Sequence, residues 1–275
     1  YLMFIKVKDK SHIRNSIFIR SSQMSDSIFL GIVLALAGGF MDAYSYISRG
    51  QVFSNGQTGN LLLFGVNLAS GNFYVSFHYI VPVIAFASGI ALSEVIHIVA
   101  YKRNEKFLSD TSKDSDNVCN KSVETSGRRP SRLMPSFSML SFHWRQVSIL
   151  IEAVIIILVA FVPVGENQLA NSLTSLACGI QVESFRRIHN RNIATAMCVG
   201  NMRTAVESLC SYYYHREPSV KKTFLIYSSA IFFFIVGAIL GNFCINLFSE
   251  RAMLVCGMLL LIGFLIMFID LEKAE

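Results

Sequence analysis

Long apolar stretches separated by polar connections recur along this chain from residue 28 to residue 270. Six of them are long enough to cross a bilayer as helices, because about 20 apolar residues span its hydrocarbon core. The alternating ten-residue segments of a membrane β-barrel are not found in the sequence. The pattern predicts an all-α polytopic helical membrane protein, with spanning helices at approximately 28–48, 77–101, 147–164, 167–187, 222–247 and 251–270.

Two further segments, 51–71 and 192–214, are apolar but contain Gly, Asn, Arg or Glu. Lys and Arg are frequent both in the N-terminal tail and in the polar stretch 102–145, and such basic regions stay in the cytoplasm. An even number of crossings must therefore separate the tail from the loop, but three candidate segments lie between them. The segment 51–71 is the weakest of the three, so it is predicted to enter the membrane and return. Basic residues on both sides of 192–214 predict the same for that segment, with N-in and C-in topology. The alternative, in which all eight segments cross, places the long basic loop outside.

The same pattern divides the chain into a membrane region and polar appendages. The sequence "MSDSIF" from Met24 resembles a protein start more closely than Tyr1 does, so the first residues are interpreted as a tail or a mis-called start. The predicted parts are a basic N-terminal tail (1–27), the first part of membrane repeat 1 (28–101), a polar, basic, disordered cytoplasmic loop (102–145), the last helix of repeat 1 (146–164), membrane repeat 2 (165–270) and a C-terminal tail (271–275).

Composition supports a location in the cell (inner or plasma) membrane. Hydrophobic residues make up 53% and charged residues 15% of the chain, whereas a soluble domain has about 25% charged residues. The net charge of +6 comes from basic residues in loops and tail, so no nucleic-acid partner is expected. The six Cys form no CxxC pair, so no metal site is expected. Nucleophile, Walker and haem motifs are also missing, which argues against an enzyme or a cofactor.

The two membrane halves resemble each other at an offset of 141 residues. Gly38 then aligns with Gly179, Asp42 with Glu183, and the pair 59–60 with the pair 200–201, Gly-Asn in both halves. With three crossings in each half, the second half starts from the opposite side, so the repeat is predicted to be inverted. Inverted repeats with broken or re-entrant helices are typical of secondary transporters, although a fold alone does not determine a function.

The Gly-Asn elements predict a solute site. Gly56 and Gly59 are expected to let the backbone bend, and Thr58 or Asn60 to cap a short helix from about 60 to 70 whose N-terminus points to the membrane midplane. Two such N-termini, from opposite faces, favour an anion or a carbonyl-bearing solute. The alternative is tight helix packing without a ligand. The predicted substrate-binding residues are Thr58, Gly59, Asn60, Gly200, Asn201 and Arg203.

Acidic residues within the predicted spans are functional candidates, because an intramembrane charge is costly. Asp42 and Glu183 are predicted to be coupling or gating acids, with a hydrogen-bonded structural role as the alternative. Arg203 is expected to pair with Glu207 at spacing i,i+4 in preference to a solute.

Four other polar side chains receive simpler interpretations. Glu94 and His97 share a helix face and are expected to form an interfacial pair, with a proton relay as the alternative. Glu152 is expected to reach the cytoplasmic surface from the start of its helix, and Arg49 to be solvated near the outer surface.

The stretch "GFMDAYSYISRGQVFSNGQTGN" (39–60) resembles the signature of the YoaK-like membrane proteins, a family of unknown function. The matching residues are Gly39, Asp42, Ala43, Gly50, Phe53, Thr58, Gly59, Asn60 and Gly65. In the second half Gly179 and Gln181 match the family pattern, whereas Val182 and Glu183 replace its Asn-Ala. The resemblance covers about 24–270 and implies an integral membrane protein with about six spans and no established substrate.

The leading hypothesis is a secondary transporter of a small anionic solute. Its transport is expected to be coupled to protons and to need no cofactor. The lipid bilayer and an unidentified solute are then its partners, and small residues at spacing four (Ala35 and Gly39, Gly237 and Gly241) are compatible with a homo-oligomer. One alternative is a membrane scaffold or sensor whose basic loop recruits a cytoplasmic partner. A passive channel is the other.

Overall fold

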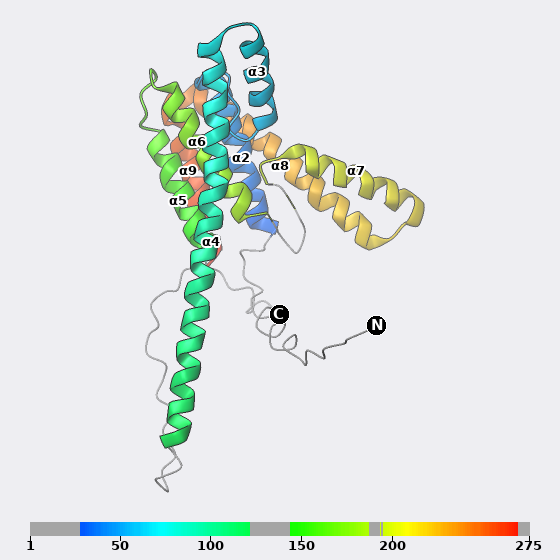
Figure 1. The fold of residues 1–275 in the computed structure, drawn as a ribbon. Coiled ribbons are helices and arrows are strands. Elements are labelled where there is room, and N and C mark those ends of the chain that lie inside the picture. The colour runs from blue at the N-terminus through cyan, green and yellow to red at the C-terminus, as the bar shows by residue number, and fades with distance from the viewer. Residues whose placement is uncertain (1–27, 122–143, 187–192, 194, 269–275) are drawn as a thin grey trace, which may run out of the picture.

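The structure, a computed structural model, describes residues 28–121, 144–186, 193 and 195–268, with the backbone alone for 104–121. The predicted tails and residues 122–143 of the predicted loop lie outside the described residues. Helices make up almost all of the described part, which contains no strand, so the all-α prediction is confirmed (Figure 1). In chain order the elements are α2 (Ile28–Ser48), α3 (Gln57–Ala69), α4 (Phe73–Lys121), α5 (Trp144–Val159), α6 (Asn167–Ser184), α7 (Cys198–His215), α8 (Pro218–Phe248), the 3-10 turn η2 (Ser249–Ala252) and α9 (Met253–Ile266).

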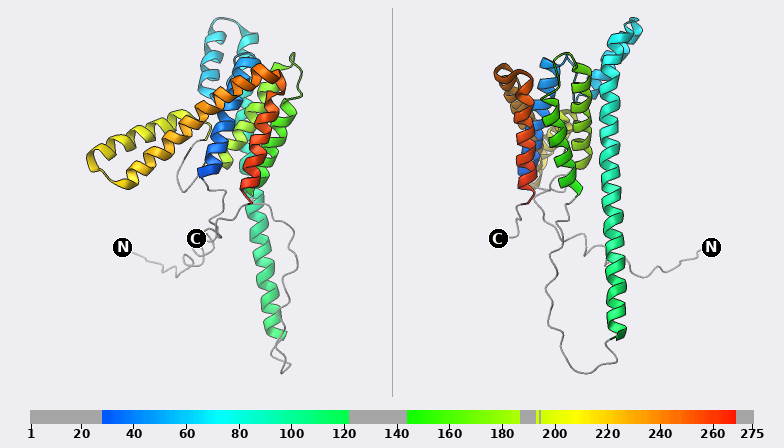
Figure 2. Two further views of the ribbon diagram at one scale, coloured as in Figure 1. Left: turned by 180° about the vertical axis from the view of Figure 1, so that it is seen from behind. Right: turned by 90° about the vertical axis from the view of Figure 1, so that its left-hand side faces the viewer.

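The helices form a bundle in which segments of the two halves pair across the chain. Helix α2 packs along α8, α4 packs along α6, and α5 packs along α9 (Figures 1 and 2). The two short helices each pack against the next helix of their own half, α3 against α4 and α7 against α8. Apolar side chains from α2, α5 and α9 fill the centre, among them Leu34, Phe40, Ile149, Ile156 and Leu260.

Glycines bring the long helices into close contact. A Cβ built on Gly39 of α2 would overlap the backbone of Phe234 on α8, and one on Gly237 of α8 would overlap the backbone of Leu36. Small residues at such positions let two backbones approach within a membrane. The α2–α8 contact therefore depends on residues without side chains.

Large apolar side chains also cover the outside of the bundle. Ile84 on α4, Phe232 and Phe243 on α8, and Leu265 on α9 are each about 60% exposed. Polar side chains such as Ser45, Asn60, Glu152 and Gln181 are instead buried. An apolar exterior around polar interior groups fits a protein surrounded by lipid, where interior polar groups must find partners within the protein.

Three helical stretches of the described chain are long and apolar enough to cross a membrane: Ile28–Ser48, Phe73–Arg103 and Pro218–Ile266. The third contains two of the predicted spans, since η2 breaks it after Phe248. Helix α5 has only 16 residues, and α6 contains several Asn, Ser, Thr and Gln. The three stretches therefore cover four of the six predicted spans, namely 28–48, 77–101, 222–247 and 251–270.

Helix α4 differs from the prediction at its C-terminal end. It continues to Lys121, twenty residues into the segment predicted to be a disordered loop from residue 102, and projects beyond the bundle (Figures 1 and 2). The reason lies in the sequence, because no Gly or Pro stands between residues 102 and 121, and Lys, Arg and Glu tolerate helix well. Polar composition alone indicated a loop, but no Gly or Pro occurs from residue 102 until Gly127.

Candidate functional site

The chain reverses direction after α2 and returns to the middle of that helix. Gly50 and Gln51 adopt positive φ angles of 87° and 60°, a conformation that glycine tolerates best. The returning segment brings Asn55 beside Gly38, whose carbonyl oxygen accepts a hydrogen bond from Asn55 Nδ2 at 3.2 Å. Helix α3 then leads away from this point. The N-terminus of α3 thus lies against the centre of α2.

The Asp42 carboxylate occupies the N-terminus of α3. The Asn55 amide donates to Asp42 Oδ1 at 2.7 Å, and the amides of Ser54 and Gly56 also direct hydrogen bonds to this carboxylate. These three donors lie just before Gln57, the first residue of α3. Asp42 therefore holds the loop that precedes α3 against α2, and its donors differ from the N–H groups of residues 60–63 that the sequence had assigned to an anionic solute.

Asn60 closes the loop between α2 and α3. Its Oδ1 accepts from the Phe53 amide at 3.0 Å, and its Nδ2 donates to the Phe53 carbonyl at 2.7 Å. The prediction that Asn60 or Thr58 caps the helix is wrong, because α3 begins at Gln57 and has no side-chain cap bond at Gly56. The fully buried Asn60 amide instead pairs with both backbone groups of Phe53, as the backbone of a neighbouring strand would.

Gly56 and Gly59 provide space for an aromatic ring. A Cβ at either position would lie 3.0 Å from an atom of the Phe53 side chain, and this ring stacks on Tyr46 with centroids 5.1 Å apart. The φ angle of Gly56 is −75°, and Gly59 is not among the positive-φ residues. The predicted reason for these glycines, a tight backbone bend, is therefore wrong, because the turn lies at Gly50 and Gln51.

The second half approaches α2 from another side. Gln181 Nε2 donates to the Leu34 carbonyl and to Thr195 Oγ1, both at 3.0 Å. Ala196 lies against Gly38, where a Cβ would be 3.3 Å from the Ala196 Cα. Cys198, the first residue of α7, is close enough to Asp42 to interact electrostatically. The segments that precede α3 and α7 therefore converge on the stretch from Gly38 to Asp42.

The predicted substrate-binding residues divide into buried and exposed groups. Asn60 and Asn201 are buried, each as the fourth residue of its short helix. Thr58, Gly200 and Arg203 are exposed, and Gly59 is partly buried. Arg203 Nε contacts Glu207 Oε1 at 2.9 Å, which is the pairing favoured by the sequence. The two Asn residues thus share burial and helix position, whereas three of the other four predicted residues are exposed.

The other acidic residues of the prediction lie in different settings. Glu183 is partly buried near the end of α6, with Arg186 Nη1 3.4 Å from its Oε1. Glu94 and His97 form the expected pair, with His97 Nδ1 3.7 Å from Glu94 Oε2, and both are about half exposed. Asp42 alone among these acids contacts the converging segments.

Arg49 is fully buried, so its predicted solvation is wrong. Its guanidinium donates to the carbonyls of Pro163 and Val162 at 2.9 and 2.8 Å, and to the Tyr44 hydroxyl at 2.9 Å. Asn171 Nδ2 donates to the Arg49 carbonyl at 2.7 Å. The five-donor fork of arginine suits several acceptors at once. Arg49 thus joins the end of α2 to the connection between α5 and α6, which sequence periodicity does not reveal.

Glu152 also departs from its prediction. Its side chain is fully buried within the bundle and does not reach a surface, and neither carboxyl oxygen has a hydrogen-bond partner among the described residues. Cys178 on α6 and Cys256 on α9 are close enough to interact with it electrostatically. Its sequence position early in α5 suggested an interfacial residue, but the inward face of α5 is set by packing against α6 and α9.

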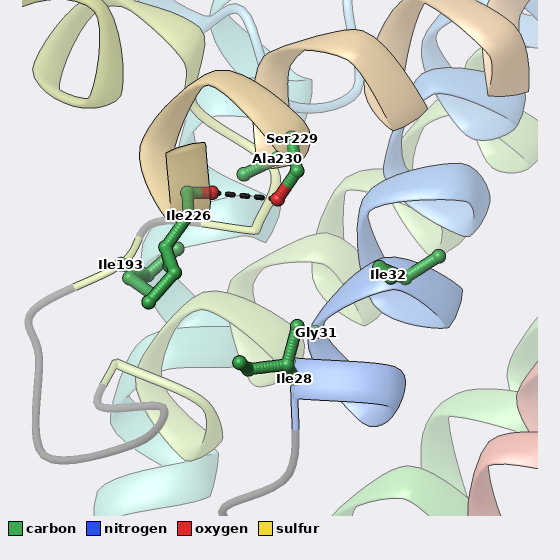
Figure 3. Close-up of a pocket in the computed structure, with 7 residues that line it drawn as sticks. All are labelled: Ile28, Gly31, Ile32, Ile193, Ile226, Ser229 and Ala230. Atoms are coloured by element: carbon green, nitrogen blue, oxygen red, sulfur yellow. Dashed lines mark hydrogen bonds between the residues drawn. The ribbon is translucent and has the colours of Figure 1, made fainter. Parts of the chain in front are cut away.

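A small pocket lies away from these residues. It is bounded by the start of α2, residue 193 and α8, and Figure 3 shows its lining residues Ile28, Gly31, Ile32, Ile193, Ile226, Ser229 and Ala230. The Ser229 hydroxyl donates to the Ile226 carbonyl at 2.8 Å, so the wall of the pocket is almost entirely apolar. Its volume of about 20 Å³ is enough for one water-sized molecule. A polar solute has no binding groups there.

The chain is similar to known proteins of a family whose activity is not assigned. Residues 30–266 match the model of a family described as "Protein of unknown function (DUF1275)". The chain is also 24% identical over 212 residues to the UPF0700 transmembrane protein YoaK of Bacillus subtilis (strain 168), covering 76% of this chain and 79% of that protein. No solved structure matches the chain. The resemblance carried by residues 39–60 is confirmed.

Proposed function

We propose a transport function from the premise that this chain belongs to the DUF1275 family of membrane proteins. In this proposal it is a secondary transporter of a small solute, coupled to protons, in the cell membrane. The convergence of two helix-initiating segments on Gly38–Asp42 of α2 is the observation that carries it. Broken segments that meet inside a bundle are where transporters place their substrate and coupling-ion sites.

The pairing of the helices supports an inverted repeat. Helix α3 begins at Gln57 and α7 at Cys198, which are 141 residues apart. The first half contains α2 to α5 and the second half contains α6 to α9. The first helix of each half packs against the third helix of the other, α2 against α8 and α6 against α4, and the last helices α5 and α9 pack together. In this proposal six helices cross, N-in and C-in, while α3 and α7 enter and return. The two third helices, α4 and α8, do not follow the offset of 141 residues. Gly89 of α4 contacts α6 at Gly179, and the corresponding glycine of α8, Gly237, contacts α2 near Gly39.

Asp42 is proposed as the coupling acid of the site. The α3 N-terminus attracts a negative charge, and Asp42 supplies that charge from within the protein. An anionic solute would compete with this carboxylate, and protonation of Asp42 would reduce the repulsion between them. In this proposal a proton and an anion enter together, while Asn60 holds the loop before α3 through the backbone of Phe53.

Proton flux in liposomes tests the proposal. The purified chain is reconstituted in vesicles that contain a pH-sensitive dye, and inorganic phosphate, sulfate, lactate and amino acids are added outside one at a time. We expect one class of solute to change the luminal pH with the wild-type chain. Asp42→Asn should abolish this change, because the amide keeps an acceptor oxygen for Asn55 and loses the charge. The matched control, Glu166→Gln, alters an exposed residue and should behave like the wild type.

Other results would separate the alternatives. Solute entry that persists in Asp42→Asn without any pH change would favour a passive channel. Absence of flux with every solute class and both gradient directions would overturn the transport proposal.

One observation favours the scaffold alternative. Helix α4 has 49 residues, about 73 Å at 1.5 Å per residue, which is more than twice the hydrocarbon thickness of about 30 Å. Its distal part projects away from the bundle and begins with Lys102 and Arg103. Deleting residues 104–140 discriminates the two functions, since a transporter should retain flux and a scaffold should lose its cytoplasmic partner.

A further inference from the structure

A polar seam runs along the buried face of α6. Asn171, Ser175, Cys178 and Gln181 are all at most 1% exposed, and they recur at helical spacing on one side of the helix. Asn171 contacts the Arg49 carbonyl near the end of α2, and Gln181 contacts the Leu34 carbonyl near its start. The seam therefore follows α2 through most of the bundle.

The seam contains acceptor atoms without partners among the described residues. Asn171 Oδ1, Ser175 Oγ and Gln181 Oε1 lack hydrogen bonds there, as does Asn55 Oδ1 beside Gly38. Buried polar atoms are nearly always paired with protein or ordered water. These four oxygens are spread along α2 from Arg49 to Leu34, and each can still accept a hydrogen bond from a proton donor.

Glu152 faces the middle of this seam. It interacts with Cys178, which in turn lies close to Asp42, to Asn55 and to Met41, whose Sδ is 3.7 Å from Cys178 Sγ. An ionised carboxylate without partners is very costly in such surroundings, whereas the neutral acid carries no charge. Glu152 is therefore placed to hold a proton between the seam and Asp42.

Other titratable groups near α5 are few among the described residues. Helix α6 contributes Cys178, α9 contributes Cys256, and α2 contributes Asp42 beyond Cys178. Helix α4 contributes Glu94 and His97, and the His97 ring lies 4.6 Å from that of Trp144 at the start of α5. Trp144 lies about two turns from Glu152 along α5. None of them forms an ion pair with Glu152.

We infer that Glu152 is a proton-binding site of the bundle, and that its proton passes along the polar seam of α6 to drive the proposed transport. The coupling part of this inference rests on the proposed function, whereas the proton-binding part is independent of it. Glu152, and not Glu183, is then the second acid of the pathway with Asp42. Glu183 pairs with Arg186 and is less suited to exchange a proton.

Infrared spectroscopy of the reconstituted full chain tests proton binding directly. We expect a protonated-carboxyl band at neutral pH that shifts in D₂O, is lost in Glu152→Gln, and persists at a changed position in Glu152→Asp. Glu166→Gln is the matched control and should leave the band unchanged. A band that is the same in Glu152→Gln and in the wild type, or one in the wild type that is insensitive to D₂O, overturns the inference. A contribution from Asp42 is identified by its loss in Asp42→Asn. Should Glu152→Gln fail to fold, an unchanged band in Glu152→Asp would overturn it.

The liposome assay separates this inference from the proposed function. Proton-coupled flux that is as fast in Glu152→Gln as in the wild type would support transport and would show that Glu152 does not take part in it. A Glu152 band that exchanges in D₂O, together with no solute flux, supports the proton site and contradicts transport. Loss of both the band and the coupled flux in Glu152→Gln supports the inference in full.

Discussion

Gly89 on α4 and Gly179 on α6 meet back to back, and a Cβ built on either would lie 3.1 Å from the Cα of the other. Each such Cβ would also overlap a backbone carbonyl of the opposite helix, that of Leu176 or Phe86. The overlap is with backbone, which cannot rotate away as a flexible side chain can. The contact between the third helix of one half and the first helix of the other therefore requires glycine on both sides.

Gly89→Ala and Gly179→Ala should each destabilise the protein. The added methyl group must separate α4 from α6, and overpacking of this kind costs about 1–3 kcal/mol. Thermal unfolding in detergent micelles measures the effect as a lowered midpoint. Gly65→Ala is the matched control in α3, where nothing lies within 4 Å of the added Cβ, and it should be neutral or stabilising by up to about 1 kcal/mol. A wild-type midpoint for Gly179→Ala would contradict the close crossing.

Asn60→Ala should open the loop that precedes α3. Both the amide and the carbonyl of Phe53 lose their partner, and an unsatisfied buried group costs about 1–3 kcal/mol. Asn60→Asp should also destabilise, because a carboxylate accepts from the amide but has no N–H for the carbonyl. Hydrogen exchange measured by mass spectrometry should increase over 51–60.

Asn67→Ala is the control for Asn60. Asn67 Nδ2 donates only to the Leu63 carbonyl within the same helix, so its loss should leave exchange over 51–60 unchanged. Equal exchange in the Asn60 and Asn67 variants would show that the Asn60 clamp does not hold the loop.

The sequence predicts where helices occur but not which polar side chains face inward. Hydropathy placed a helix in each expected segment, and the repeat offset of 141 agreed with the starts of α3 and α7, because both signals are local. The sequence predicted both Arg49 and Glu152 at a surface, and both are buried. The burial of Arg49 depends on the distant carbonyls of Val162 and Pro163, and that of Glu152 on the packing of α5 against α6 and α9. The Asn55 contacts with Gly38 and Asp42 also went unpredicted, because the return of the chain is set at Gly50 and Gln51.

Arg49→Ala should lower the free energy of unfolding by at least about 3 kcal/mol, because it leaves several buried acceptors unpaired. Arg49→Lys should recover little, since an ammonium group cannot reach the separate acceptors on Tyr44, Val162 and Pro163 with the geometry of a guanidinium. Thermal unfolding measures both variants. Arg251→Ala removes an exposed arginine and should change the midpoint little. A stable Arg49→Lys would mean that charge alone, without the fork geometry, joins α2 to the 162–167 connection.

The proposed topology predicts which loops face the cell exterior. Single Cys residues are placed at Ser70, Ser126 and Ser219 in a variant without native Cys, and intact cells are treated with an impermeant thiol reagent. Ser70 follows α3 and Ser219 is the second residue of α8, and both are exposed. We expect labelling at Ser70 only, because an N-in chain whose segment 51–71 returns has its long basic loop and the α7–α8 connection inside. Labelling at Ser126 from outside would mean that the segment containing α3 crosses, and the inverted repeat and the proposed site would then both be wrong.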